Sequence, residues 1–414
     1  MLKKIPVTEA RLGMHLQRLE GPWLSHPFWK TSFTLDDPAD LARLRASAVT
    51  HCWIDVALGL DVAAPAAAAT AAPAPVPAPA PARVPAPAVA APPAWTSMDE
   101  ELQRAAQICK SGRAAVKSLF AEARMGRALD AEGCLPLVDD IAGSVLRNPG
   151  ALVSLARLKT ADDYSYMHSV AVCALMVSLA RQLGMDDAAC REAGLAGLMH
   201  DLGKAMMPLE VLNKPGRLTE AEFAVMKTHP VRGHELLVEG RGAGPAVLEV
   251  CLHHHERPDG RGYPHGLAGD EVSLLARMGA VCDVYDAITS NRPYKAGWDP
   301  AESVAQMASW KGQFDDAVFQ AFVRSLGIYP TGSLVRLESG RLAVVLEQNP
   351  GALVAPVVRV FYSTKSQMPV PVQRVDLAAA GCRERIVGRE SPERWGFKQI
   401  DELAFDGEVL KRSR

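Results

Sequence analysis

The chain has 414 residues, of which 48% are hydrophobic and 22% charged, and its formal net charge is −2. This is ordinary globular composition with room for two or three domains, and it excludes the strongly basic surface that is typical of DNA-binding proteins. The eight cysteines form no C-x-x-C pair, so we expect buried thiols in a cytoplasmic protein rather than a disulfide framework.

The chain begins with a segment that mixes strand and helix signals. Short runs such as "GMHLQRL" and "HCWIDV" are typical of strands, and "DPADLARLRAS" has helical spacing behind an N-cap-like aspartate. We therefore predict a small α+β module over residues 1–62. Residues 63–94 are nearly all Ala and Pro, and ten prolines in 32 positions forbid a continuous helix. This stretch is predicted to be an extended linker and not a membrane span.

The pattern becomes helical over residues 95–328, where apolar residues recur at spacings of three and four. After residue 328 the period changes to two, as in "GSLVRLESGRLAVVLEQN" and "PVVRVFYS". The sequence thus predicts a mainly α protein. An all-helical core would carry the small N-terminal α+β module and, over residues 329–414, a small β appendage with a C-terminal tail.

Polar residues interrupt the apolar faces of these helices. A lone histidine in such a place is usually a satisfied core residue, but six of the eleven histidines gather here beside two aspartates. Imidazole and carboxylate ligands without cysteine suit iron, manganese or zinc, and the set is larger than one ion needs, which favours a two-metal site. Lys204, predicted on the same helix as His200 and Asp201, indicates an anionic substrate. The interrupting residues are His168, His200, Asp201, His229, His253, His254, His255 and Asp283.

A second group of features lies just beyond the paired histidines. Gly260, Gly262 and Pro264 predict a tight turn, and Asp283 and Asp286 then stand three residues apart on one predicted helix. Arg292 and Lys295 follow. Their charge alone fits solvated surface residues equally well, but their place after the Asp283 helix favours contacts with phosphate.

Taken together, four blocks resemble an HD-GYP domain, a branch of the HD-superfamily metal phosphohydrolases. They are "HD" at 200–201, "KTHPVRGHELL" at 227–237, "HHERPDGRGYP" at 254–264 and "DVYDAITSNRPYK" at 283–295. The resemblance covers roughly residues 150–325, with every block in order. Residues 1–62 also resemble the small domain of unknown function that often precedes HD-GYP domains.

The resemblance implies a role for each matching residue. It implies one divalent metal ion on His168, His200, Asp201 and Asp283. It implies a second ion on His229, His254, His255 and Asp201, so that Asp201 would bridge the two ions. The catalytic residues would be Asp201 and Lys204. Phosphate would be bound by Lys204, Arg292 and Lys295. Gly262, Tyr263 and Pro264 would shape the pocket rim and contact other proteins, and His253 would not be a ligand.

The implied activity is hydrolysis of cyclic di-GMP to pGpG by hydroxide held between two ions, most consistent with Fe or Mn. The sequence leaves open whether pGpG is cut again to GMP. The alternatives are a catalytically silent cyclic di-GMP receptor and an HD hydrolase for another nucleotide. The implied protein partners are GGDEF-type or other signalling proteins, through the GYP surface or the N-terminal module; no DNA is expected. Some family members hold a third ion through a glutamate four residues before the first histidine. This chain has Tyr164 there, with Asp163 one position off, so we expect two ions.

Overall fold

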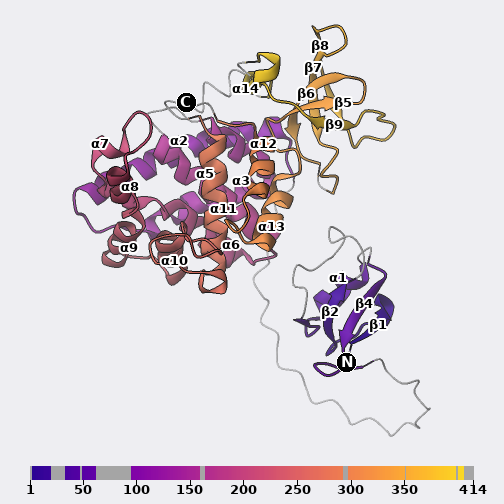
Figure 1. Cartoon of the computed structure of the whole chain (residues 1–414), viewed down its shortest axis with the longest axis horizontal. Coiled ribbons are helices and arrows are strands. Elements are labelled where there is room, and N and C mark those ends of the chain that lie inside the picture. The colour runs from indigo at the N-terminus through magenta and orange to yellow at the C-terminus, as the bar shows by residue number, and fades with distance from the viewer. Residues whose placement is uncertain are drawn as a thin grey trace, which may run out of the picture. The chain divides into compact units, whose positions relative to one another are not determined.

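The computed structural model describes residues 2–19, 33–46, 49–61, 95–158, 164–291, 297–349, 351–397 and 400–404. The chain divides into two compact units, Met1–Ala90 and Ala91–Arg414 (Figure 1). The finer division expected at residues 62, 94 and 328 stays a prediction.

In its described residues, the N-terminal unit is a four-stranded antiparallel sheet with one α-helix. The strand order is β1-β4-β2-β3, with β1 paired to β4 from Leu2↔Asp55 to Pro6↔His51. Strand β4 alternates between buried and half-buried residues, so Cys52 and Ile54 point into a small apolar core. The predicted α+β module is confirmed. Its elements are β1 (Leu2–Pro6), η1 (Val7–Glu9), β2 (His15–Leu19), β3 (Phe33–Thr34), α1 (Pro38–Ala46) and β4 (His51–Asp55).

The second unit is mainly helical, as predicted. Several helices begin where the sequence supplies a capping side chain: Ser97, Asp186 and Ser273 each accept a hydrogen bond from a backbone N–H in the first turn of α2, α6 and α11. The helices are α2 (Met98–Arg124), α3 (Leu135–Arg147), α4 (Pro149–Arg157), α5 (Tyr164–Gln182), α6 (Asp187–Met199), α7 (Leu209–Leu212), α8 (Glu220–Met226), α9 (His229–Glu239), α10 (Pro245–His253), α11 (Leu274–Thr289), α12 (Pro300–Ser309) and α13 (Asp316–Leu326), with the 3₁₀ helices η3 (Glu132–Cys134), η4 (Leu202–Met206) and η5 (Gly269–Glu271).

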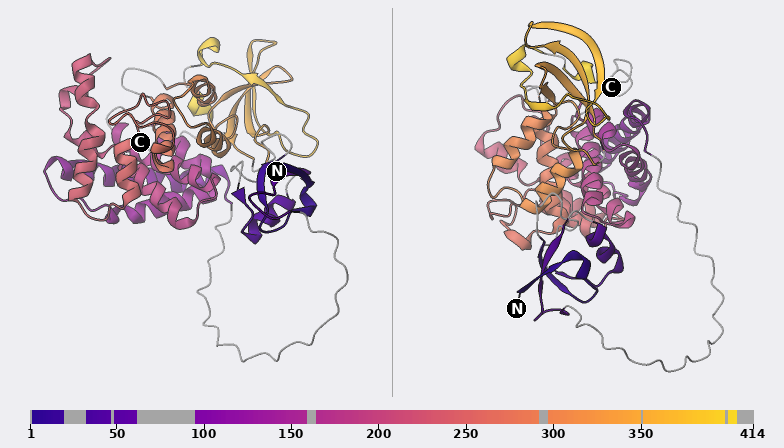
Figure 2. Two further views of the ribbon diagram at one scale, coloured as in Figure 1. Left: turned by 60° about the horizontal axis from the view of Figure 1, so that its bottom comes forward. Right: turned by 90° about the vertical axis from the view of Figure 1, so that its right-hand side faces the viewer.

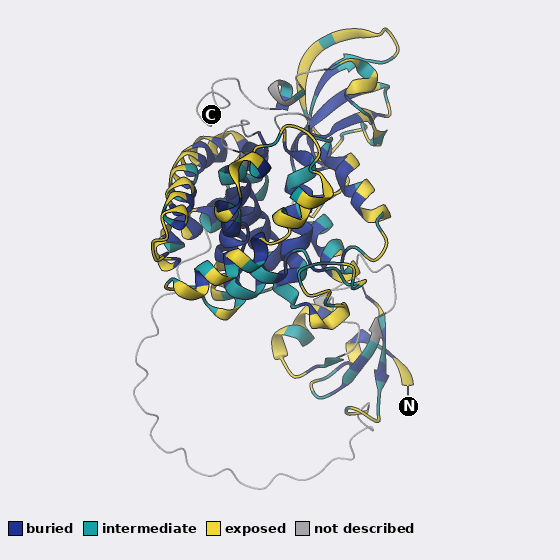
Figure 3. Cartoon of the chain, turned by 60° about the vertical axis from the view of Figure 1, so that its left-hand side comes forward, coloured by how far each residue is buried: buried dark blue, intermediate teal, exposed yellow. Residues whose placement is uncertain are grey.

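Helix α5 is the centre of this unit. Every residue from 167 to 180 is buried, which explains why its sequence is apolar on all sides rather than along one stripe. Figure 3 shows the buried residues concentrated in the interior of the helical unit. His168 lies on this central helix and is itself only 2% exposed, so its imidazole must find partners inside the protein.

The C-terminal part forms a five-stranded antiparallel sheet, in the order β8-β7-β6-β5-β9. Figure 2 shows it against one side of the helical body in both views. The sheet is joined to α12 by two hydrogen bonds, from the Leu334 amide to Asp299 Oδ2 (3.0 Å) and from Arg389 Nη1 to the Ala301 carbonyl (2.7 Å). The expected β appendage is confirmed. Its elements are β5 (Leu334–Leu337), β6 (Arg341–Glu347), β7 (Val357–Ser363), β8 (Met368–Asp376), β9 (Ile386–Arg389), η6 (Glu393–Trp395) and α14 (Ile400–Ala404).

All eight cysteines are free thiols, and all but Cys382 are buried, in line with the sequence-based expectation. Across the described ranges, no helix combines the length and the apolar character that crossing a membrane requires.

Candidate metal centre

The motif residues come together from five different elements. His168 lies in α5 and Asp283 in the middle of α11, whereas His200 and Asp201 follow the last residue of α6. His229 opens α9, and His254 and His255 follow directly after α10. Histidine and aspartate ligands far apart in the sequence thus meet in one buried region, because the helices that carry them pack against each other.

One sequence-based expectation is wrong. We expected His200, Asp201 and Lys204 to share one α-helix, but α6 ends at Met199 and Lys204 lies in the 3₁₀ helix η4. The chain tightens here because Gly203 runs directly against α9: a Cβ atom on Gly203 would lie 1.9 Å from the His229 carbonyl oxygen. In a 3₁₀ helix the side chains at i and i+3 eclipse each other, so Lys204 still meets Asp201.

The side chains form two clusters that meet at Asp201. In one, Asp201 joins His229, His254 and His255; in the other, His168, His200 and Asp283 lie together, and the donor atoms within each cluster are within 4.8 Å of one another. Asp201 Oδ1 is 3.2 Å from His229 Nε2, while Asp201 Oδ2 is 3.4 Å from His168 Nε2 and 3.5 Å from His200 Nε2. One carboxylate therefore presents one oxygen to each cluster. The structure thus brings together the side chains for which the resemblance implied a ligand role.

Backbone carbonyls fix the orientation of three imidazoles. Nδ1 of His200 donates to the Gly197 carbonyl (2.8 Å) and Nδ1 of His229 to the Met226 carbonyl (2.8 Å), while Nδ1 of His254 lies 3.1 Å from the carbonyls of Val250 and Cys251. With the proton on Nδ1, each ring turns the lone pair of Nε2 toward the centre. Such outer hydrogen bonds set the tautomer of metal-binding histidines.

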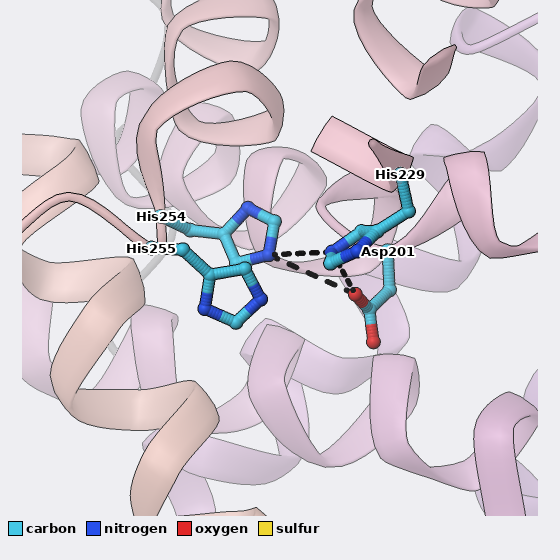
Figure 4. A group of neighbouring side chains, drawn as sticks. All are labelled: Asp201, His229, His254 and His255. Carbon is cyan, nitrogen blue, oxygen red and sulfur yellow. Dashed lines mark hydrogen bonds and ion pairs between the residues drawn. The ribbon is translucent and has the colours of Figure 1, made fainter. Parts of the chain in front are cut away.

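The centre consequently holds acceptors that face one another without a proton between them. His229 Nε2 and His254 Nε2 are 3.3 Å apart (Figure 4). Within the described part of the chain, His200 Nε2 and Asp201 Oδ1 are buried and have no hydrogen-bond partner. Facing lone pairs repel unless a cation lies between them, and a buried acceptor without a partner is costly. The donor set therefore fits divalent metal ions.

The electrostatics favour the same protonation states that metal ligands need. Burial lowers the pKa of His255 to about 3, and burial together with the neighbouring imidazoles lowers the pKa of His254 well below its usual value. Burial alone would raise the pKa of Asp201, but the charges of Lys204 and His200 hold it well below its usual value. At neutral pH His254 and His255 are thus neutral and Asp201 is ionised, as metal ligands need to be. At His168, hydrogen bonds to Asp283 and Asp286 outweigh burial and raise the pKa.

Lys204 lies at the edge of the centre. Its ammonium donates a hydrogen bond to Asp201 Oδ2, and its side chain is 22% exposed, against 2% for Asp201. The amine therefore joins the buried carboxylate to the more open side of the site.

The GYP segment packs against the metal centre. The Tyr263 ring stacks on His255 with ring centroids 4.7 Å apart, which supports the expectation that the segment shapes the site. At Gly262 a Cβ atom would lie 2.4 Å from the Glu256 Cα, so only glycine fits this close approach. His253 instead contacts Glu249 (2.8 Å) and His265 (3.0 Å) outside the two clusters.

Two supporting residues had no role in the sequence interpretation. Asp286 accepts a hydrogen bond from His168 Nδ1 at 2.6 Å; its spacing of three from Asp283 was the available signal. The buried Glu256 accepts hydrogen bonds from the amides of His265, Gly266 and Leu267, at 2.6 to 3.1 Å. It thereby ties the chain after the GYP motif to the end of the paired histidines.

Three expectations fall outside the described residues. Arg292 and Lys295, expected to bind phosphate, belong to the stretch 292–296, and the side chain of Tyr164 is likewise not described, nor is Asp163.

Two family models and several known proteins match this chain. The HD domain model matches residues 147–318, and a model described as a domain of unknown function, DUF3391, matches residues 2–134. A cyclic di-GMP phosphodiesterase of Pseudomonas aeruginosa is 56% identical over 405 residues, which cover 97% of this chain and 95% of the relative.

Two further relatives match a smaller part of the chain. A cyclic di-GMP phosphodiesterase response regulator of Xanthomonas campestris is 40% identical over 41% of this chain and 47% of its own length. A 3′3′-cGAMP-specific phosphodiesterase of Vibrio cholerae is 35% identical over 40% of this chain and 38% of its own length. The 56% identity over nearly the full length and the HD domain match lead to the conclusion that the chain belongs to the HD-GYP family of metal-dependent phosphodiesterases.

Proposed function

We propose that this chain hydrolyses a phosphodiester bond of cyclic di-GMP at two divalent metal ions. The observation that carries the proposal is the shared Asp201: its two oxygens face two separate clusters of imidazole and carboxylate donors. His168, His200, Asp201 and Asp283 would hold one ion, and Asp201, His229, His254 and His255 the other. The full-length relative in Pseudomonas aeruginosa carries the name of the same activity.

Bound divalent ions supply Lewis acidity, which polarises a phosphoryl oxygen and lowers the pKa of a coordinated water. The protein contributes the dry, preorganised donors around them: Asp201 and His254 are 2% and 1% exposed. Lys204, with its ammonium at the open edge, would bind a phosphoryl oxygen of the substrate and deliver a proton toward the leaving oxygen. By resemblance, Arg292 and Lys295 would take up charge on the same phosphate.

Imidazole and carboxylate ligands without thiolate suit iron, manganese or zinc, and the resemblance favours iron or manganese. Since Tyr164 replaces the glutamate that recruits a third ion in some relatives, we expect about two ions per chain. Elemental analysis of anaerobically purified protein gives both the identity and the number, and three tightly held ions would contradict the two-metal assignment.

The test of function is product chromatography with metal-loaded protein and cyclic di-GMP. We expect pGpG as first product, and GMP if the linear dinucleotide is cut again. Supplying 3′3′-cGAMP in parallel addresses the specificity named for the Vibrio relative. Asp201→Ala should lose turnover and metal together, because it removes the shared ligand. Binding of cyclic di-GMP without product from the metal-loaded wild type would identify a receptor instead of an enzyme.

We also propose that the chain works in the cytoplasm and contacts GGDEF-type or other signalling proteins through the GYP segment or the N-terminal unit. The support is the family's link to cyclic di-GMP signalling. Affinity capture with purified GGDEF domains, compared between the full chain and the chain without residues 1–94, tests this contact.

A further inference from the structure

Lys227 lies against two aromatic rings next to the metal centre. Its Nζ is 4.8 Å from the centroid of the Phe223 ring and 5.7 Å from that of Tyr263, both within the range of a cation–π contact. Tyr263 in turn stacks on His255, with the two ring planes inclined by 27°. These contacts form a connected row of side chains. It runs from the proposed metal ligand His255 through Tyr263 and the exposed Lys227 to the exposed Phe223.

Packing does not account for this row. Helix α8 carries Phe223 and contains no buried residue, and Phe223 itself is 45% exposed. The helix is held by its capping box, in which Thr219 and Glu222 satisfy each other's backbone amides, and by the ion pair of Lys214 with Glu222 (2.6 Å). Polar contacts thus stabilise the start of this helix, and its aromatic side chain stays open to solvent.

The charge of Lys227 is also uncompensated within the described ranges. The two lysines that precede it are paired, Lys204 with Asp201 and Lys214 with Glu222. For Lys227, in contrast, the contacts recorded there are the two rings and no carboxylate. A cation held by ring faces keeps its hydrogen-bond donors available, since the rings accept none of them strongly.

We infer that Phe223 and Lys227 bind the half of the substrate that is not being cleaved. This rests on the proposed function: a cyclic dinucleotide that places one phosphate at the metal ions carries a second phosphate and a second purine away from them. The Lys227 ammonium supplies a charge-assisted bond for that phosphate, and the Phe223 ring supplies a stacking surface for the purine. Both residues therefore determine affinity for a dinucleotide and not the chemistry at the metal ions.

The experiment compares cyclic di-GMP with bis(4-nitrophenyl) phosphate, a diester that has no second phosphate. Lys227→Met, which keeps the aliphatic stem on the rings, should raise KM for cyclic di-GMP about tenfold and change kcat by less than about twofold. The ratio of kcat/KM for cyclic di-GMP to that for the small diester should fall by a similar factor. Phe223→Ala should behave alike, and Phe223→Tyr should retain most of the affinity because it retains the ring.

Lys117→Met, an exposed charge change on α2, is the matched control, and metal content and melting temperature are measured on every variant. Unchanged KM for cyclic di-GMP in both Lys227→Met and Phe223→Ala, or an equal loss on the two substrates, overturns the inference while leaving the proposed function standing. A wild type that cleaves the small diester but not cyclic di-GMP overturns both.

Discussion

His168 lies between two carboxylates: its Nδ1 donates to Asp286 Oδ2 at 2.6 Å, and its Nε2 is 2.9 Å from Asp283 Oδ1. Asp286 thus orients the ring through Nδ1, while Nε2 and Asp283 both face the proposed metal site. Carboxylates in this outer position raise the basicity of a histidine ligand and fix its orientation.

Asp286→Asn should weaken metal binding in the His168 cluster by about 10- to 100-fold, since a neutral amide is a poorer acceptor for Nδ1–H. Competition with a chelator, followed by metal analysis, measures this. Ser290→Ala is the control, because Ser290 bonds the other oxygen of Asp286 at 3.2 Å and leaves the His168 contact in place. Equal metal affinity in Asp286→Asn and the wild type would refute the role.

Lys204→Ala should keep its metal ions and lose turnover, because the ammonium lies at the open edge of the site and contributes no lone pair. One lost charge-assisted contact in the transition state corresponds to about 10²-fold in kcat. Metal stoichiometry and kcat are measured on the same sample, with Lys110→Ala on α2 as the control. If metal content fell together with kcat, Lys204 would instead be a residue that supports Asp201 and does not contact the substrate.

A pH-dependent contribution to stability comes from Glu101 and Arg147, which join α2 to the end of α3. The Glu101 carboxylate accepts two hydrogen bonds from Arg147, at 2.7 and 2.8 Å. Burial acts to raise the pKa of Glu101, but these bonds outweigh it and hold the pKa below the ordinary 4.5. Because the folded pKa is depressed, the stabilisation is complete above pH 4.5 and is lost as the pH falls through the folded value.

Glu101→Gln should therefore lower the free energy of unfolding by about 2 kcal/mol at pH 7. The difference from the wild type should shrink once the pH drops below 4.5. Chemical denaturation across this range measures both, with the exposed neighbour Glu100→Gln as the control. A difference that stays constant with pH would mean that the charge of Glu101 is not what Arg147 stabilises.

Removal of residues 1–94 should leave a folded chain that binds metal and hydrolyses cyclic di-GMP at close to the full-length rate. The reason is that every proposed ligand belongs to the unit Ala91–Arg414. Circular dichroism, metal content and turnover are compared with those of the full chain. A truncated protein that folds and holds its ions but has no activity would show that the N-terminal unit completes the site.

The sequence predicted the fold class and named side chains that lie together in the structure, because motif blocks carry both residue type and order. It could not predict the end of α6 at Met199, since that end depends on contact between η4 and α9, which are separated in the chain. Nor did it indicate that β9 returns to pair with β5 across the sheet. The sequence did not predict the supporting roles of Asp286 and Glu256, because a hydrogen bond depends on side-chain direction and not on spacing alone.

The contact between Gly203 and α9 has a further consequence. A Cβ atom on Gly203 would also lie 2.5 Å from the Gly233 amide, so the two backbones touch without any side chain between them. The separation of Asp201 from His229 is therefore set by main-chain atoms, which do not change rotamer. A single methyl group at residue 203 would force η4 and α9 apart and so shift Asp201 relative to His229. It would thereby change the two metal affinities while every ligand side chain stays in the sequence.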